Sequence, residues 1–410
     1  MEQILLVTLM SNAILYVIDD EQQSVNLFME FASLLGYKTQ GFTQAIEFFN
    51  QAEDFVEGSV VVLDLVMPEM DGVEVMRKMV ELNRKLPLIL VSGYDAGVLH
   101  SAEQLAMAYS LDIVSTLTKP FDFKIFKQAI NKLTNFKKFA LSPSEFTVTA
   151  EDLAIAIEQN QLLLHYQPQI DIKTKKLIGV EALSTWQHPR FGLIKPDVFI
   201  PIAEKSGLIK ELTALVIKQA MEQALYWKSK QLLIQVSVNI SAENIISLSL
   251  PEQLKHMLDI HKLDPAMLTL EVTESALMGE LITSLDILTR LRMKGIQLSI
   301  DDFGTGYSSL SQLYRMPFTE LKVDKSFVIN MSNDEDARGI VKTCIRLGHE
   351  LKMKVVAEGV EDQQTFEILN DMGCDIVQGF YIARPMPAEQ IIPWLKGRDK
   401  NSERESVLEL

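Results

Sequence analysis

The sequence predicts an α/β protein of two domains, an open parallel sheet followed by a barrel. Three observations support this prediction. The chain has 410 residues, which is too long for one ordinary domain. Short apolar runs alternate with longer amphipathic segments, as they do in repeated strand and helix units. Polar residues, most of them acidic, follow the apolar runs, where the carboxyl ends of parallel strands would bring them together.

Composition narrows the class of function. Apolar residues make up 47% of the chain and charged residues 23%, enough for substantial cores. The formal net charge of −16 would repel phosphates, so we expect no DNA partner and no anionic membrane partner. Cys344 and Cys374 are the only cysteines, too few for a disulfide framework or a thiolate zinc site, and they suit a reducing cytoplasm. No run reaches the roughly 18 apolar residues of a membrane span.

Residues 1–12 are expected to form an N-terminal extension. The stretch is apolar but contains Glu2 and no basic residue, so it makes a poor signal peptide. Met10 offers an alternative start. We therefore expect a cytoplasmic protein.

Residues 13–136 are expected to form the first domain. Strands are predicted at residues 13–18, 60–63, 88–91 and about 112–117, with a helix after the first strand and a Met-Pro and Asp-Gly turn after the second. Each strand ends at a polar side chain that alone could be a cap or a turn residue. Three converging carboxylates would bind a divalent cation that holds a phosphoryl group, while a serine and a lysine stabilise its oxygens. The residues concerned are Asp19, Asp20, Asp64, Ser92 and Lys119.

This domain resembles the receiver domain of bacterial two-component response regulators. The motifs are Val-Ile-Asp-Asp-Glu, Leu-Asp-Leu-Val-Met-Pro-Glu-Met-Asp-Gly, Leu-Val-Ser-Gly and Lys-Pro-Phe, in that order. The resemblance implies that a cognate sensor histidine kinase phosphorylates Asp64. It also implies that Asp19 and Asp20 bind Mg²⁺, that Ser92 and Lys119 contact the phosphoryl group, and that the bond before Pro120 is cis. Thr116 stands where such domains often carry an aromatic switch residue, which puts the usual relay to the output in question.

The joint between the domains combines a helix and a linker. Residues 121–138 are amphipathic, and we interpret them as the last receiver helix packed on its sheet rather than as a membrane-surface helix. The sequence Leu-Ser-Pro-Ser at 141–144 ends that pattern. Thr149 and Asp152 form a predicted N-cap pair that opens the next helix. We place the linker at residues 137–148, the second domain at 149–398 and a C-terminal tail at 399–410.

The second domain is predicted to be a (β/α)8 barrel of the TIM type. Helical patterns lie at residues 208–228, 281–294 and 336–351. Eight strands in about 240 residues favour a barrel over an open sheet. The predicted strands are residues 162–167, 177–183, 233–240, 267–272, 296–301, 320–323, 353–357 and 375–380.

The predicted strand ends carry a large set of polar residues. In a barrel these ends form one rim, so residues far apart in sequence become neighbours. Any one of the acids could be a helix cap, but five or more converging acids would repel one another without a cation. The set has oxygen ligands and no His or Cys, which suits Mg²⁺ or Mn²⁺ better than zinc. It comprises Glu181, Asn239, Glu271, Glu274, Asp301, Asp302, Lys322, Asp324, Glu358, Glu361 and Gln378. Two ions sharing an aspartate could clamp a phosphodiester and activate a water.

This domain resembles the EAL-domain cyclic di-GMP phosphodiesterases over nearly all of residues 149–398. Eight motifs carry the resemblance together. They are Glu-Ala-Leu at 181–183, Tyr-Gln-Pro at 166–168, Val-Asn-Ile-Ser at 238–241, Glu-Val-Thr-Glu at 271–274, Asp-Asp-Phe-Gly-Thr-Gly-Tyr-Ser-Ser at 301–309, Leu-Lys-Val-Asp at 321–324, Ala-Glu-Gly-Val-Glu at 357–361 and Gln-Gly-Phe at 378–380.

The resemblance implies a role for each motif. The first metal would be bound by Glu181, Asn239, Glu271 and Asp301, and Asp301 would bridge to a second metal held by Asp302 and Glu358. Lys322 would orient the nucleophilic water, and Glu358 is either a ligand or the general base, which the sequence leaves open. Gln378 would support the site and Glu274 would anchor the loop after Asp302, expected to be mobile and to join catalysis to the contacts of a homodimer. Supporting or substrate-contacting positions are Gln167, Leu183, Asp324 and Glu361.

The implied reaction is hydrolysis of cyclic di-GMP to linear pGpG, modulated by phosphorylation of the receiver with a sign that the sequence does not give. One departure opens an alternative. Active members usually carry Arg, facing a substrate phosphate, where this chain has Thr185. Loss of a charge-assisted contact costs on the order of 1.5 to 3 kcal/mol, so we expect weaker substrate binding. The alternative is a catalytically weak cyclic di-GMP receptor that acts through protein contacts.

Overall fold

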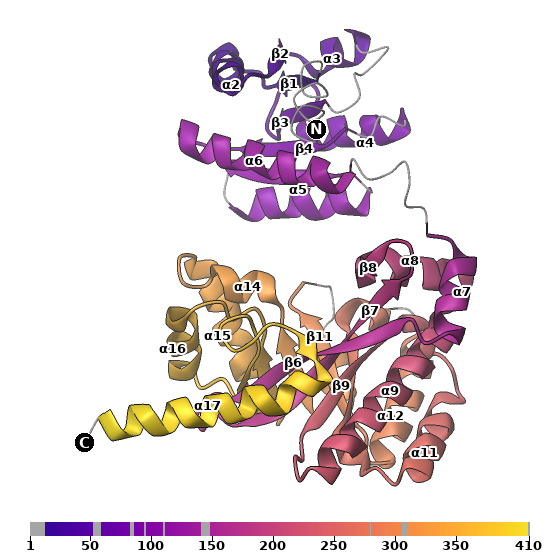
Figure 1. The fold of residues 1–410 in the computed structure, drawn as a ribbon. Coiled ribbons are helices and arrows are strands. Elements are labelled where there is room, and N and C mark those ends of the chain that lie inside the picture. Colours follow the sequence, from indigo (N-terminus) through magenta and orange to yellow (C-terminus); the bar gives the residue numbers. More distant parts are fainter. Residues whose placement is uncertain are drawn as a thin grey trace. The chain divides into compact units, whose positions relative to one another are not determined.

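The computed structural model describes residues 13–51, 59–82, 86–93, 96–109, 111–140, 148–278, 280–305 and 310–408 (Figure 1). The chain divides into two compact units, residues 1–147 and 148–410. The expected N-terminal extension with Met10, and residues 141–147 of the expected linker, lie outside the described residues.

The N-terminal unit is a five-stranded parallel sheet in the order β2-β1-β3-β4-β5. The strands are β1 Ile14–Ile18, β2 Lys38–Phe42, β3 Val60–Asp64, β4 Leu88–Ser92 and β5 Ile113–Thr118, and the helices are α2 Gln22–Leu34, α3 Ala45–Gln51, α4 Gly72–Glu81, α5 Ala96–Ala108 and α6 Phe123–Ala140. Strand β2 was not among the predicted strands. Among the described strands it pairs with β1 alone, and it is mostly half-exposed, so its sequence, Lys-Thr-Gln-Gly-Phe, lacks the apolar run of a central strand.

Both faces of this sheet are covered by helices. Along β1, Tyr16 and Ile18 pack with residues of α3, α4 and α5, whereas Leu15 and Val17 pack with residues of α2 and α6. Side chains alternate between the faces of a strand, so a strand buried on both faces is apolar throughout its length. The continuous apolar run at residues 13–18 is therefore explained by a doubly covered parallel sheet.

The C-terminal unit is a closed barrel of eight strands in the cyclic order β6-β14-β13-β12-β11-β10-β9-β7 (Figure 1). The strands are β6 Leu162–Asp171, β7 Leu177–His188, β9 Gln235–Ile240, β10 Leu268–Thr273, β11 Gln297–Phe303, β12 Glu320–Val323, β13 Lys354–Ala357 and β14 Ile376–Val377. Two short strands outside the ring, β8 Gly192–Ile194 and β15 Met386–Pro387, were not predicted. The last barrel strand is shorter than the predicted range 375–380.

Strand β6 is antiparallel to both of its neighbours, β7 and β14, and this departs from the all-parallel (β/α)8 pattern that we expected. The reason is the connection between β6 and β7. Only residues 172–176 join the two strands, and a parallel pair needs a crossover of a dozen or more residues. The resulting hairpin places Gln167 opposite Glu181 and Gln169 opposite Gly179.

The helices of this unit begin and end close to the predicted patterns. The capping box predicted at Thr149 and Asp152 is present and opens α7. Helix α17 continues to Leu408, through the expected tail, and in the N-terminal unit α6 continues to Ala140, past the expected receiver boundary at 136. The helices are α7 Ala150–Glu158, α8 Pro196–Ser206, α9 Ile209–Ser229, α10 Ala242–Ile245, α11 Leu250–His261, α12 Leu281–Met293, α13 Leu310–Arg315, α14 Lys325–Asn330, α15 Glu335–Glu350, α16 Gln363–Asp371 and α17 Ala388–Leu408, with two 3-10 turns, Pro265–Met267 and Glu274–Met278.

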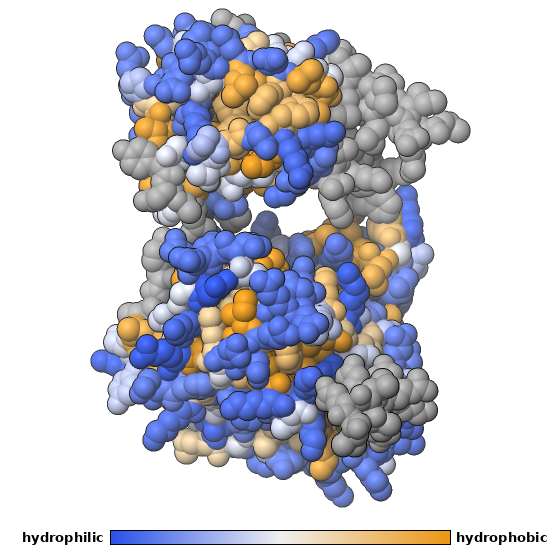
Figure 2. All heavy atoms as spheres, turned by 90° about the vertical axis from the view of Figure 1, so that its left-hand side faces the viewer, coloured by the Kyte–Doolittle hydropathy of each residue, from blue (hydrophilic) through white to orange (hydrophobic). Residues whose placement is uncertain are grey.

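The helices were compared in length and apolar content with the roughly 20 apolar residues that a membrane span needs. None of those in the described ranges combines the length and the apolar content that crossing a bilayer requires. Hydrophilic side chains cover much of the surface of each unit that Figure 2 shows, with smaller apolar areas among them.

Candidate active site

Acidic side chains meet at the carboxyl edge of the N-terminal sheet, as the strand ends predicted. Carboxylate oxygens of Asp19, Asp20 and Asp64 lie within 4.8 Å of one another. Lys119 Nζ donates to Asp19 Oδ2 at 2.7 Å and to Asp64 Oδ2 at 2.5 Å. Burial raises the pKa of Asp19 despite the bond from Lys119. An oxygen-only cluster of this kind fits Mg²⁺.

The backbone around Asp64 holds this carboxylate in place. Val66 N donates to Asp64 Oδ1 at 3.0 Å, and Asp71 caps α4 by accepting from Glu74 N. A side chain at Gly72 would place its Cβ 2.7 Å from Asp64 O, so only glycine allows α4 to start this close to the strand end. Ser92, at the end of β4, is fully buried, and the bond before Pro120 is cis.

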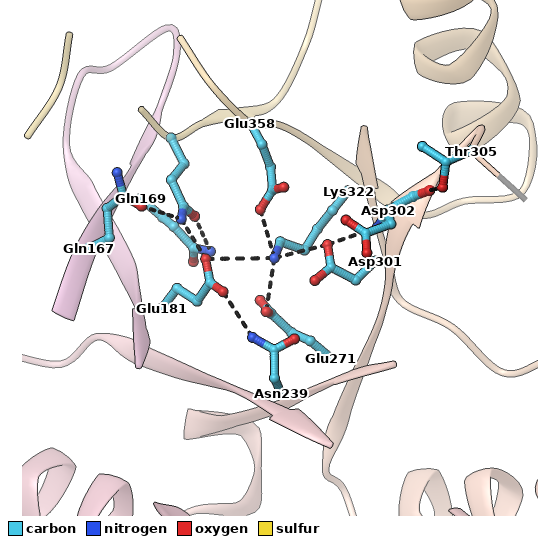
Figure 3. Close-up of polar contacts among 11 residues, drawn as sticks. Gln167, Gln169, Glu181, Asn239, Glu271, Asp301, Asp302, Thr305, Lys322 and Glu358 are labelled. Atoms are coloured by element: carbon cyan, nitrogen blue, oxygen red, sulfur yellow. Dashed lines mark hydrogen bonds and ion pairs between the residues drawn. The ribbon is translucent and has the colours of Figure 1, made fainter. Parts of the chain in front are cut away.

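The mouth of the barrel is built around one buried ammonium group. Lys322, on β12, has no exposed surface. Four carboxylates surround its Nζ, each from a different strand or the segment after one (Figure 3). The distances are 2.8 Å to Glu271 Oε2, 2.8 Å to Glu358 Oε1, 3.1 Å to Asp301 Oδ1 and 3.7 Å to Glu181 Oε2.

Negative charge exceeds positive charge in this cluster, because four carboxylates face one ammonium group. Burial lowers the pKa of Lys322, but the four carboxylates outweigh burial and raise it well above its usual value. Burial also raises the pKa of Glu271 well above its usual value and that of Glu358 to about 8. The cluster therefore needs a further cation if all its carboxylates are to be ionised.

The donor set fits a divalent ion. Glu271 Oε1 is buried without a hydrogen-bond partner among the described residues, an arrangement that a metal ligand would explain. Oxygens of Asp301, Asp302 and Glu358 lie within 4.8 Å of one another. Asn239 Nδ2 donates to Glu181 Oε1 at 2.9 Å, which commits the amide nitrogen to Glu181 and leaves its oxygen as the ligand atom. All the predicted metal positions of the barrel thus lie at one mouth, and carboxylate and amide oxygens suit Mg²⁺ or Mn²⁺.

The turn after β11 positions Asp302 beside this cluster. Asp302 has a positive φ of 53°, and its backbone N donates to Asp301 Oδ1 at 2.9 Å. Burial, together with the charges of Asp301 and Asp324, raises the pKa of Asp302 to about 6. Gly304 N donates to Glu274 Oε2 at 3.1 Å, so Glu274 contacts the start of the loop. Residues 306–309, on which the expectation of a mobile loop depends, lie outside the described residues.

A cavity of about 390 Å³ adjoins the cluster, a size in the range of small-molecule sites. Among its walls are predicted supporting residues, namely Gln167, Leu183, Glu361 and Gln378. Asp324 does not line this cavity. Its Oδ1 accepts from Ser326 N at 2.9 Å, so the described role of Asp324 is to cap α14.

Two polar residues at this mouth were not singled out from the sequence. Lys325, the first residue of α14, lines the cavity and adds positive charge to its wall. Gln169 is buried and donates to Gln378 Oε1 at 2.9 Å. Its position two residues after Gln167 on one strand was the available signal, because alternate residues share a face.

Comparison with known families decides the assignment of the barrel. The family model for the EAL domain matches residues 150–385, more than half of the chain. The chain belongs to the EAL domain family. A second family model, for the response regulator receiver domain, matches residues 15–131. The chain thus carries an N-terminal receiver domain and a C-terminal EAL domain.

Several relatives share the EAL domain. The bifunctional diguanylate cyclase/cyclic di-GMP phosphodiesterase MucR of Pseudomonas aeruginosa is 44% identical over 242 residues, which is 59% of this chain and 35% of MucR. The cyclic di-GMP phosphodiesterase NbdA of the same organism is 40% identical over 248 residues, 60% of this chain and 32% of NbdA. The chain therefore spans about a third of the length of these relatives.

Solved structures give the same result for the fold. The structure described as PaMucR phosphodiesterase in complex with c-di-GMP has a TM-score of 0.57 at 44% identity, covering 59% of this chain and 98% of that chain. The structure of the EAL enzyme Bd1971 in its cGMP-bound form has a TM-score of 0.56 at 27% identity, covering 72% of this chain and 79% of that chain.

We predict that Mg²⁺ stabilises the EAL domain more at pH 8 than at pH 6. A carboxyl group whose pKa is raised by folding stabilises the fold while it is protonated, and this contribution is lost as the pH rises through the folded pKa. Those folded values are about 6 for Asp302 and about 8 for Glu358. At high pH the ion therefore offsets the repulsion between ionised carboxylates. At low pH it must first displace protons from Asp302 and Glu358.

Thermal unfolding followed by tryptophan fluorescence measures this effect in the EAL domain alone, because the three tryptophans, Trp186, Trp227 and Trp394, all lie in it. The Tm shift on adding Mg²⁺ should be larger at pH 8 than at pH 6, and Glu358→Gln should reduce this difference. An equal shift at both pH values would contradict the prediction.

Proposed function

We propose that this chain hydrolyses cyclic di-GMP to linear pGpG and that phosphorylation of its receiver domain modulates the reaction. The observation that carries the proposal is the complete set of carboxylate and amide ligands around Lys322, beside a cavity of about 390 Å³. Relatives named cyclic di-GMP phosphodiesterases support the same substrate. A protein that only bound the dinucleotide would not require Lys322 and Glu358 in contact at 2.8 Å.

Six residues of the barrel mouth would bind the ions. Glu181, Asn239, Glu271 and Asp301 would hold a first ion, and Asp302 and Glu358, with Asp301 shared, a second. Bound ions would supply positive charge to the phosphodiester oxygens and lower the pKa of a water molecule. Either one or two ions are compatible with this ligand set, with Glu358 as base or as ligand.

Lys322 and Glu358 are the candidates for orienting and deprotonating the nucleophilic water. Lys322 Nζ donates to Glu358 Oε1, so it orients this carboxylate, and the raised pKa of Glu358 suits a group that accepts a proton near neutral pH. In the reaction a water oxygen forms a bond to phosphorus, the P–O3′ bond breaks, and the 3′ oxygen leaves with a proton. The product is a linear dinucleotide with a 5′-phosphate.

The decisive assay incubates the purified chain with cyclic di-GMP and Mg²⁺ or Mn²⁺ and separates the products by chromatography. We expect linear pGpG. Glu181→Gln should lower kcat by about a hundredfold or more, because a ligand position loses its charge. Glu222→Gln, an exposed carboxylate on α9, is the matched control and should have no effect. If the parent protein binds cyclic di-GMP without hydrolysing it, the proposed phosphodiesterase activity is wrong.

A second candidate function is a weak receptor for cyclic di-GMP, and Thr185 favours it. Thr185 Oγ1 donates to Leu163 O at 3.2 Å and lies 3.1 Å from His165 Nδ1. The hydroxyl is thus used within the β6–β7 hairpin, and the cationic side chain that active members carry at this position is absent.

We predict that Thr185→Arg lowers the KM for cyclic di-GMP. A charge-assisted phosphate contact contributes on the order of 1.5 to 3 kcal/mol, which corresponds to a ten- to hundredfold lower KM. Thr185→Met, of similar reach but without charge, is the control and should leave KM near the parent value. Turnover that appears only with Thr185→Arg would instead favour the receptor, and an unchanged KM in both variants would show that this position does not face the phosphate.

Regulation is proposed to begin at Asp64, phosphorylated by a cognate sensor histidine kinase in the cytoplasm with one Mg²⁺ at Asp19 and Asp20. Lys119 and Ser92 would contact the phosphoryl group. The output would be a change in the loop after Asp302, directly or through a homodimer. The receiver-type acidic cluster supports the first step of this proposal, and Thr116 in the switch position makes the later steps the ones to test.

We predict that acetyl phosphate changes the turnover of the parent protein but not that of Asp64→Asn. The readout is the initial rate of pGpG formation at fixed Mg²⁺. Asp71→Asn, at the cap of α4, retains the phosphoacceptor and is the control. Identical rates for treated parent and Asp64→Asn would exclude coupling between the two domains.

A further inference from the structure

Three glutamine side chains form a hydrogen-bond chain that ends on Glu181 (Figure 3). Gln169 Nε2 donates to Gln378 Oε1 at 2.9 Å. Gln378 Nε2 in turn donates to Gln167 Oε1 at 2.9 Å and to Glu181 Oε2 at 2.5 Å. All four side chains are buried, so water does not substitute for these bonds at low cost.

The carboxylate of Glu181 fixes the direction of these hydrogen bonds, because it can only accept. Both N–H groups of Gln378 point to oxygens, so its Oε1 must find a donor elsewhere, and Gln169 provides it. If the Gln378 amide turned over, its oxygen would face Glu181 Oε2 and Gln167 Oε1, three acceptors without a hydrogen between them. Gln167 cannot turn either, because its Nε2 donates to Ala383 O at 3.1 Å. Gln169 therefore supplies the donor for the Gln378 Oε1 atom, which this orientation would otherwise leave buried without a partner.

Gly179 provides the space for Gln169. It lies opposite Gln169 in the β6–β7 pair and two residues before Glu181, on the same face of β7. A Cβ at this position would lie 2.9 Å from Gln169 Oε1. The φ angle of Gly179 is not positive, so this position requires glycine for space rather than for backbone conformation.

We propose that Gln169 is a positioning residue that holds Glu181 in its ion-binding orientation through Gln378, and that Gly179 is glycine to admit it. The inference rests on the proposed function, since it assumes that Glu181 binds an ion. Gln378 holds Glu181 Oε2 while Asn239 holds Oε1. Lys322 Nζ lies 3.7 Å from Oε2, farther than its 2.8 Å contact with Glu271. Without the amide bond, Glu181 can rotate toward Lys322 and is withdrawn from the ion.

The test measures Mn²⁺ binding without substrate, from the EPR signal of free Mn²⁺. All proteins carry Asp20→Asn and Asp64→Asn, so that the acidic cluster of the receiver does not contribute. Gln169→Met preserves length without hydrogen bonding, and Gly179→Ala displaces the amide while retaining every polar group. We expect both to weaken Mn²⁺ binding about ten- to a hundredfold, the usual effect of losing a group that orients a metal ligand.

The control is Gln219→Met, which removes a partly buried glutamine bond to Leu162 O on the same strand β6, and it should leave Mn²⁺ affinity unchanged. Turnover adds a second readout. The loss in Gln169→Met and Gly179→Ala should be recovered at saturating Mn²⁺, whereas a merely structural defect would lower kcat at every Mn²⁺ concentration.

The possible failures are distinguishable. Unchanged Mn²⁺ affinity in both variants, or lost turnover that Mn²⁺ does not recover, overturns the role of Gln169. If Gln169→Met fails to fold by tryptophan fluorescence, Gly179→Ala decides alone. If the parent shows no Mn²⁺ binding that Glu181→Gln removes, the ion site and with it the proposed function fail.

Discussion

The barrel mouth depends on the imbalance between one buried ammonium group and the carboxylates around it. A lysine without any exposed surface is unfavourable unless anions compensate it, and four carboxylates within 3.7 Å do so. The same four anions are in excess once Lys322 is satisfied, and their mutual repulsion adds to the burial that raises the pKa values of Glu271 and Glu358. The surplus negative charge gives the site an affinity for a divalent cation, and the closed barrel prevents the carboxylates from moving apart.

The receiver domain uses a similar pairing with a different degree of burial. Lys119 also bridges two carboxylates, but 23% of its side chain is exposed. A partly exposed ammonium group can change partners at little cost, for example from Asp64 to a phosphoryl group on Asp64. Lys322 has no exposed surface, so exchanging one of its four carboxylate partners costs more than it does for Lys119. The environment of Lys119 is thus compatible with the proposed phosphorylation of Asp64, and that of Lys322 with the proposed rigid site.

Sequence alone predicted those parts of the structure in which local pattern and tertiary contact agree. The apolar runs identified four of the five receiver strands and all eight strands of the ring, and the acids at strand ends identified both clusters. The failures have physical causes. Strand β2 is an edge strand with one partner, and the reversed direction of β6 follows from the length of residues 172–176 rather than from its composition. Asp324 caps α14, a role compatible with support of the site, so its expected supporting role stays a prediction. Gln169 was missed because it follows the matched motif Tyr-Gln-Pro, and only the alternation of residues along the strand points to it.

The use of amides around Glu181 also has an electrostatic reason. A carboxylate can be oriented by lysine, arginine or a neutral donor, and the cationic donors form the stronger bond. A cation at this place would also cancel part of the negative charge that attracts the divalent ion. Gln378 and Asn239 each donate to a different oxygen of Glu181 and add no net charge. The orientation of Glu181 is therefore fixed without any positive charge beyond that of Lys322, and the hydrogen bond from Gln169 to Gln378 links that orientation to the β6–β7 hairpin, where Gly179 leaves the necessary space.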